Sequence, residues 1–239
     1  MRVLDVGSGA GDAALVAADL VGTAGSVTGV DTAEAAVQWA SARCLSRRTG
    51  NIEFRVGDPT EMEFRAPFDA IVGRFVLMYY ADPVHAIRKL ARHLQPGGLM
   101  VFQEFDMSYL RSHPAAPTFE RATELMIGTL RATGTRTQLG SELYSVFVTA
   151  GLPAPALRMD VLVGGGDLFP GYEILAGTIQ SLLPAMEKLG IATQGDIDVP
   201  TLAARMREEV MASKGVAFTP ALIGAWSRMS TKPNGICSF

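Results

Sequence analysis

The chain has 239 residues, of which 48% are hydrophobic and 19% are charged, and its formal net charge is −3. This composition allows one sizeable hydrophobic core with at most a small second lobe. The acidic balance and the lack of a long basic run argue against nucleic acid as a partner. No stretch approaches about 18 unbroken apolar residues, so neither a membrane-spanning helix nor a membrane partner is expected.

The cysteines and the start of the chain bear on its compartment. Cys44 and Cys237 lie far apart and fit no metal-ligand spacing, so neither a metal site nor a disulfide framework is expected. Val3 already belongs to an expected strand, so no cleaved leader is expected. These features predict a soluble, cytoplasmic protein in a reducing environment.

Strand and helix signals alternate through the first half of the chain. Short apolar runs predict five strands, at residues 2–7, 26–31, 52–58, 68–75 and 99–105. Apolar residues at helical spacing predict helices between them, at residues 12–22, 32–50 and 82–94. Pro83 opens the last of these helices, and the turn at 95–98 closes it. Strands separated by helices of this size predict a parallel sheet that is covered on both faces.

The pattern changes after a first segment that spans residues 1–110. Residues 111–155 are expected to be a mostly helical insertion that leads to a sixth strand. A second helical stretch is too short to form a domain of its own, and we expect it to cap one edge of the sheet. The expected segments are a sixth strand at 156–168, a helical cap at 169–214, a last strand at 215–231 and a tail at 232–239.

A glycine turn joins the first strand to the first helix. Gly7, Gly9 and Gly11 can take positive φ and let the backbone approach a ligand, although such a turn can also close a tight corner. Asp31 ends the second strand about 20 residues after Gly11, where a carboxylate can accept hydrogen bonds from ribose hydroxyls. Thr32 can cap the next helix, which would leave Asp31 free for a ligand. The pair predicts a nucleoside site.

Three details separate a dinucleotide from a nucleoside that carries a cation. The spacing is Gly-x-Gly-x-Gly, whereas Gly-x-Gly-x-x-Gly suits a pyrophosphate on the helix N-terminus. Asp5 lies just before the turn, where it would repel a pyrophosphate but could face an amino or sulfonium group. Asp58 ends the third strand, where it can accept from an exocyclic adenine amine.

Together these residues resemble the class I S-adenosylmethionine-dependent methyltransferases of the small-molecule type, most strongly over residues 2–106. "VLDVGSGAGD" resembles the family's first motif, "VTGVD" the second, "GDPTEMEF" the third, "FDAIVGRFVLMYYADP" the fourth and "LQPGGLMVFQE" the region after it. The resemblance implies S-adenosylmethionine as cofactor, with S-adenosylhomocysteine as product. The residues that it assigns to the cofactor are Asp5, Gly7, Ser8, Gly9, Gly11, Asp31, Thr32, Gly57, Asp58, Pro59, Arg74 and Phe75.

The resemblance also implies a fold and a reaction. The fold is a doubly wound α/β sheet of seven strands, mostly parallel with an antiparallel last strand, plus helical cap insertions. The family normally has one or two helices before the first strand, and here Met1 directly precedes that strand. The reaction is in-line transfer of a methyl group that the cofactor has already activated, so the protein mainly aligns the reactants and excludes water.

Acceptor-side residues are expected after the fourth and fifth strands. Glu104 stands directly at a strand end and is a candidate base, although it could instead bind the acceptor or cap a helix. His113 has a suitable ordinary pKa, but a loop histidine beside Pro114 can also have no role. The residues expected to contact the acceptor, or else to pack, are Tyr79, Tyr80, Asp106, Tyr109 and Tyr172.

The predicted function is methylation of a small organic acceptor, because the cap is apolar and has no basic cluster. Oxygen is the expected acceptor atom by frequency in the family, with nitrogen and carbon left open, and a homodimer is allowed. One alternative is a cofactor-binding module without catalysis. Another is a nicotinamide-dependent oxidoreductase, which would need a Tyr-x-x-x-Lys pair that the sequence lacks.

Overall fold

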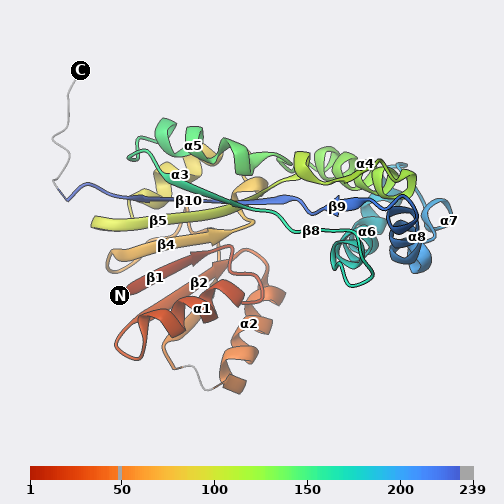
Figure 1. Ribbon diagram of the computed structural model, residues 1–239. Coiled ribbons are helices and arrows are strands. Elements are labelled where there is room, and N and C mark those ends of the chain that lie inside the picture. The colour runs from red at the N-terminus through yellow and green to blue at the C-terminus, as the bar shows by residue number, and fades with distance from the viewer. Residues whose placement is uncertain (48–49, 232–239) are drawn as a thin grey trace. The chain divides into compact units, whose positions relative to one another are not determined.

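Figure 1 shows the fold as a computed structural model, which describes residues 1–47 and 50–231. The expected tail at 232–239 and Cys237 therefore lie outside the described residues. The chain divides into two compact units. The first contains Met1–Glu104, Ser141–Arg158 and the described part of Ile223–Phe239; the second contains Phe105–Gly140 and Met159–Leu222.

The first unit is built on a seven-stranded sheet with the order β3-β2-β1-β4-β5-β10-β7. Its strands are β1 (Arg2–Val6), β2 (Ser26–Asp31), β3 (Ile52–Val56), β4 (Phe68–Arg74), β5 (Leu94–Asp106), β7 (Ala156–Asp160) and β10 (Ala221–Arg228). The five strands from β3 to β5 pair in parallel, and one strand pair near the far end is antiparallel. This mixed sheet confirms the predicted seven-stranded α/β fold.

The helices of this unit bury apolar residues that recur at helical spacing. They are α1 (Asp12–Val21), α2 (Glu34–Arg47), α3 (Pro83–Ala91) and α5 (Leu139–Thr149). On one face, Val3 of β1 packs with Ala14 and Ala18 of α1. Elsewhere in the unit, Phe147 of α5 packs edge-on against Phe102 of β5, with 6.4 Å between the ring centroids. Within the described residues, no helix is long and apolar enough to cross a lipid bilayer.

The second unit holds helices and a small sheet. The helices are α4 (Pro117–Ala132), α6 (Gly171–Lys188), α7 (Gln194–Ile197) and α8 (Val199–Ala212). Helix α6 contacts both α4 and α8, so parts of the expected insertion and of the expected cap share one core. Antiparallel pairing of β6 (Arg111–His113) and β8 (Val163–Gly164) with the central strand β9 (Val216–Phe218) forms the sheet.

This small sheet corrects two strand predictions. The expected sixth strand at 156–168 is divided into β7 and β8, and the expected last strand at 215–231 is divided into β9 and β10. Pro220 lies between β9 and β10, and proline has no N–H to donate to a strand ladder. In addition, β5 begins at Leu94, so the glycines expected to form a turn before it lie within the strand.

Candidate functional site

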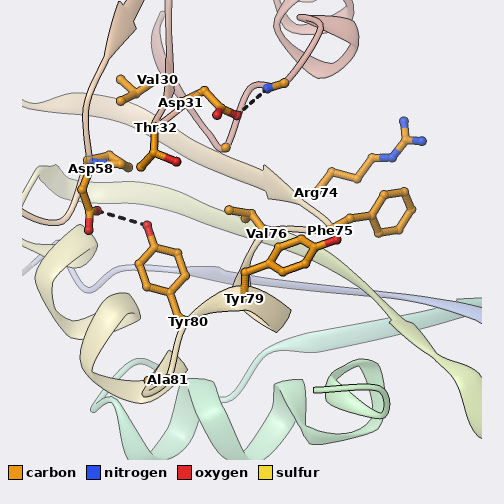
Figure 2. Close-up of a pocket in the computed structure, with 13 residues that line it drawn as sticks. Val30, Asp31, Thr32, Asp58, Arg74, Phe75, Val76, Tyr79, Tyr80 and Ala81 are labelled. Carbon is orange, nitrogen blue, oxygen red and sulfur yellow. Dashed lines mark hydrogen bonds between the residues drawn. The ribbon is translucent and has the colours of Figure 1, made fainter. Parts of the chain in front are cut away.

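A pocket of about 630 Å³ opens in the first unit (Figure 2). Four segments form it: the glycine turn after β1, the end of β2, the turn after β3 and the segment after β4. Carboxyl ends of neighbouring parallel strands share one edge of a sheet, which is where open α/β folds bind ligands. The lining residues are Gly7, Gly9, Val30, Asp31, Thr32, Asp58, Pro59, Arg74, Phe75, Val76, Tyr79, Tyr80 and Ala81.

The glycine turn packs tightly against the protein at Gly7 and is open to solvent space at Gly9. Gly7 has a φ of 65°, and a Cβ there would lie 2.3 Å from Cγ2 of Val76. Gly9 has a φ of 50°, but a Cβ there would meet no protein atom within 4 Å. The backbone at Gly7 therefore accommodates the segment after β4, and the backbone at Gly9 is open for a ligand to approach.

Asp31 ties the glycine turn to the end of β2. Its Oδ2 accepts a 2.8 Å hydrogen bond from the Gly9 N–H, and its Oδ1 accepts a 2.9 Å bond from the Ala33 N–H just before α2. The expectation that Thr32 would relieve Asp31 of this second bond is therefore wrong, because the Asp31 carboxylate itself accepts from the N–H two residues further along the chain. A carboxylate has about four lone-pair sites, so Asp31 can still accept from a ligand.

Asp58 collects three donors on one oxygen. Its Oδ1 accepts bonds of 2.9 Å from the Thr60 N–H, 2.8 Å from the Thr60 hydroxyl and 3.1 Å from the Tyr80 hydroxyl. Burial, and then the negative charge of Asp58, raises the pKa of Tyr80, so the phenol stays protonated and can donate. These contacts fix the orientation of the Asp58 carboxylate at the pocket wall (Figure 2).

Asp5 lies beneath the glycine turn and does not line the pocket. Its side chain is 1% exposed and accepts a hydrogen bond from the Ala14 N–H of α1. Asp5 and Val3 point to the same face of β1, which α1 covers, and this is why Asp5 does not reach the pocket lining. Burial raises the pKa of Asp5 to about 7; Asp31 adds to the rise and Arg74 opposes it.

Three more predicted cofactor residues, Ser8, Gly11 and Gly57, also lie outside the pocket lining. Ser8 is buried, and a Cβ at Gly11 would lie 2.9 Å from the Phe54 ring. At Gly57 a Cβ would lie 2.8 Å from the sulfur of Met62. These residues shape the turns that carry the lining residues.

Glu104, the predicted base, is 0% exposed and does not line the pocket. Its Oε1 accepts hydrogen bonds of 3.0 Å from the Val76 N–H and 2.8 Å from the Leu77 N–H. Burial raises the pKa of Glu104 to about 7, against the opposing effect of bonds from Leu77, Val76 and Met78. The carboxylate thus holds the backbone of the segment that follows β4.

The structure brings only two of the predicted acceptor residues to the pocket. Tyr79 is 66% exposed there, and Tyr80 lies beside it. The other three, together with the candidate base His113, belong to the second unit and do not line this pocket. They are Asp106, which accepts from the Ser108 N–H; Tyr109, partly exposed; His113, exposed on β6; and Tyr172, fully buried against Phe169.

Three lining residues, Val30, Val76 and Ala81, were not predicted from the sequence. Small apolar side chains carry no chemical signal of their own. Val30 could have been predicted from its place at the end of β2, directly before Asp31. A nucleoside whose ribose is bound by Asp31 would lie close to this residue.

Comparison with known proteins identifies the family to which this geometry belongs. Residues 1–151 match the model of a family described as "Methyltransferase domain". A demethylmenaquinone methyltransferase of Lactococcus lactis is 30% identical over 126 residues, which are 52% of this chain and 48% of that protein. The chain spans about half the length of the first curated relatives that it matches.

One relative matches over a longer stretch. A nocamycin O-methyltransferase of Saccharothrix syringae is 26% identical over 212 residues, which are 87% of this chain and 76% of that protein. Among solved structures, the YcgJ protein of Bacillus subtilis superposes with a TM-score of 0.59 at 19% identity, over 96% of this chain and 92% of that one. At this identity the structural match supports the fold alone.

Proposed function

The chain belongs to the methyltransferase-domain family, with the Rossmann-like fold of class I S-adenosylmethionine-dependent methyltransferases, and we propose that it methylates a small organic acceptor. The observation that carries the proposal is the pocket itself. Two strand-end carboxylates, Asp31 and Asp58, and the open backbone at Gly9 line one cavity of about 630 Å³, within the usual volume of small-molecule sites.

The chemistry of the lining residues supports a place for each part of the cofactor. Asp58 suits the exocyclic amine of adenine, and Asp31 suits the ribose hydroxyls, because both groups need acceptors. Gly9 leaves room for the methionine end. Arg74 is the one positively charged residue in the described lining and suits the carboxylate of that end. When bound, S-adenosylmethionine supplies a methyl group activated by its sulfonium.

The chain's own task is to orient the acceptor and exclude water. Phe75, Tyr79 and Tyr80 give the pocket aromatic walls on the side of the segment after β4, which favours a flat or apolar acceptor. The nocamycin O-methyltransferase supports oxygen as the methylated atom, whereas the demethylmenaquinone methyltransferase keeps other acceptor atoms open. The absence of nucleic acid partners, a homodimer and a cytoplasmic location stay predictions.

A transfer assay tests the proposal. The protein is incubated with S-adenosylmethionine labelled on its methyl group and with phenols, quinols and amines as separate acceptor panels. We expect label in at least one phenolic or quinolic product, with inhibition by S-adenosylhomocysteine. Cofactor binding with no transfer to any panel would favour the alternative of a binding module without catalysis. Absence of cofactor binding would contradict the proposal.

A further inference from the structure

We propose that Glu104 is a positioning residue, which holds residues 76–78 so that Val76 and the two following tyrosines form one wall of the pocket. The inference rests on the proposed function, since the wall matters only if the pocket binds a cofactor. It differs from the role of base that the sequence suggested for Glu104.

The anchor is a buried carboxylate bonded to backbone. Oε1 of Glu104 accepts from the Val76 N–H at 3.0 Å and from the Leu77 N–H at 2.8 Å. Neither donor has a partner within the short helical turn at Leu77–Tyr79, because Val76 is its N-cap and Leu77 its first residue. Oε2 has no hydrogen-bond partner among the described residues, so the known bonds of this side chain serve the segment after β4.

The segment leaves β4 through a constrained bend. Phe75 has a φ of 56°, a conformation that a non-glycine residue rarely takes. Its N–H donates a 2.9 Å bond to the carbonyl of Gln103, the residue before Glu104. Two consecutive residues of β5 therefore hold three consecutive N–H groups, from Phe75 to Leu77. Such a hold offsets the backbone strain at Phe75.

Val76 transmits this hold to the glycine turn. A Cβ at Gly7 would lie 2.3 Å from Val76 Cγ2, and a Cβ at Gly73 would lie 3.0 Å from Val76 Cγ1. The valine side chain thus occupies the space that Gly7 leaves open, and it shares the space at Gly73 with the Phe102 ring, whose Cε1 would lie 2.3 Å from that Cβ. A shift of the Val76 backbone would press its side chain into the glycine turn that lines the pocket, because protein interiors are closely packed and have little free volume.

The two tyrosines depend on the same segment. The Tyr79 N–H donates to the Val76 carbonyl and the Tyr80 N–H to the Leu77 carbonyl, each at 3.1 Å. Tyr80 then reaches Asp58 through its hydroxyl. A displaced segment would therefore move both aromatic walls and the donor that orients Asp58.

Two substitutions of Glu104 distinguish positioning from base catalysis, because the two roles predict opposite orders of activity for the two variants. Glu104→Gln keeps the length of the side chain and an acceptor oxygen but removes the carboxyl. Glu104→Asp keeps the carboxyl but is one methylene too short to reach both N–H groups. We expect Glu104→Gln to bind S-adenosylhomocysteine within about threefold of the unaltered protein, and Glu104→Asp to bind at least about tenfold more weakly, the loss of roughly one charged hydrogen bond.

Calorimetry with S-adenosylhomocysteine gives the affinities, and hydrogen exchange at residues 76–78 gives a readout of the segment itself. Protection there should persist in Glu104→Gln and fall in Glu104→Asp. Turnover should likewise be higher in Glu104→Gln than in Glu104→Asp. If Glu104→Asp turns over faster than Glu104→Gln at equal cofactor affinity, Glu104 is a base and the inference is wrong. Equal affinity and equal protection in both variants would also overturn it.

Two controls keep this test independent of folding and of the proposed function. Glu120→Ala removes a carboxylate that accepts from the Ser112 N–H and hydroxyl in the second unit, and it should leave cofactor affinity unchanged. If Glu104→Asp does not fold, Val76→Ala trims the wall without touching the carboxylate and should weaken binding of S-adenosylhomocysteine, whereas unchanged affinity would contradict the inference. Failure of the unaltered protein to bind would refute the proposed function instead.

Discussion

The hydroxyl of Tyr80 donates a 3.1 Å hydrogen bond to Oδ1 of Asp58, and this bond joins the segment after β4 to the turn after β3 across the pocket (Figure 2). The two residues are 22 positions apart in the sequence. The side of the pocket proposed for adenine is therefore formed by two segments, one after β3 and one after β4. The contribution of the hydrogen bond between them can be measured.

Tyr80→Phe removes the hydroxyl and keeps the ring. We expect the affinity for S-adenosylmethionine to fall by up to about tenfold, since a single hydrogen bond contributes roughly 0.5–1.5 kcal/mol. Titration calorimetry measures the change. Tyr144→Phe, on the half-exposed tyrosine of α5, is the matched control and should bind like the unaltered protein. Equal affinity for both variants would separate Tyr80 from the cofactor site.

Asp31→Ala removes the ribose acceptor together with the bond to Gly9. The expected loss of S-adenosylmethionine binding is about 1.5–3 kcal/mol, the range for hydrogen bonds to charged groups. Asp82→Ala removes a comparable bond, which the His85 N–H donates to the Asp82 carboxylate at the start of α3. This control should lose about 1 kcal/mol of stability and no cofactor affinity. An unchanged affinity of Asp31→Ala would refute the ribose assignment.

Gly9→Ala tests the open side of the glycine turn. Gly9 and Gly22 both have positive φ, at 50° and 66°, and neither has a protein atom within 4 Å of an added Cβ. Alanine at either position should therefore lower the free energy of unfolding, at Gly22 by at least about 1–2 kcal/mol because its ψ of −172° lies outside the left-handed helical region. Only Gly9→Ala should also weaken S-adenosylhomocysteine, because Gly22 is not part of the lining. Parallel urea unfolding and calorimetry decide the matter, and equal binding by both variants would contradict the assignment.

Stability should fall with rising pH because of the buried acid at Asp5. Burial raises the pKa of Asp5 from 3.8 to about 7, with Asp31 raising and Arg74 lowering it. The folded protein therefore keeps a proton that the unfolded chain releases. The free energy of unfolding then decreases between about pH 4 and about pH 7, by at most about 1.4 kcal/mol per pH unit from this group, and is level above.

Asp5→Asn removes this contribution, so its stability relative to the unaltered protein should improve as the pH rises from about 4 to about 7. Urea unfolding at several pH values measures the difference. Asp82→Asn provides a control on the surface of the same unit. A difference for Asp5→Asn that does not change with pH would show that Asp5 titrates in the folded protein as it does in the unfolded chain.

Strand ends were the part of the site that the sequence could predict. Asp31 and Asp58 follow apolar runs, and the carboxyl ends of neighbouring parallel strands meet at one edge, so their approach to Gly9 follows from the order of elements. The faces of the strands were harder to predict. Asp5 points toward α1 because residues two apart in a strand share one face, and Val3 on that face packs against α1. The sequence motif alone does not show which face a helix covers.

Contacts between distant segments could not be predicted. The partners of Glu104 and the bond between Tyr80 and Asp58 depend on how the segment after β4 bends at Phe75, which takes a rare backbone conformation. The three-stranded sheet was missed because its strands have two or three residues, too few to show a period. Pro220 was the one signal that could have divided the last strand.

Titration calorimetry of the unaltered chain with S-adenosylhomocysteine, S-adenosylmethionine and NAD tests the central claim most directly. Two acceptor carboxylates and an open glycine backbone, without the longer glycine spacing that suits a pyrophosphate, predict binding of the first two ligands and none of NAD. Binding of NAD, or binding of neither S-adenosyl compound, would contradict the assignment of this pocket.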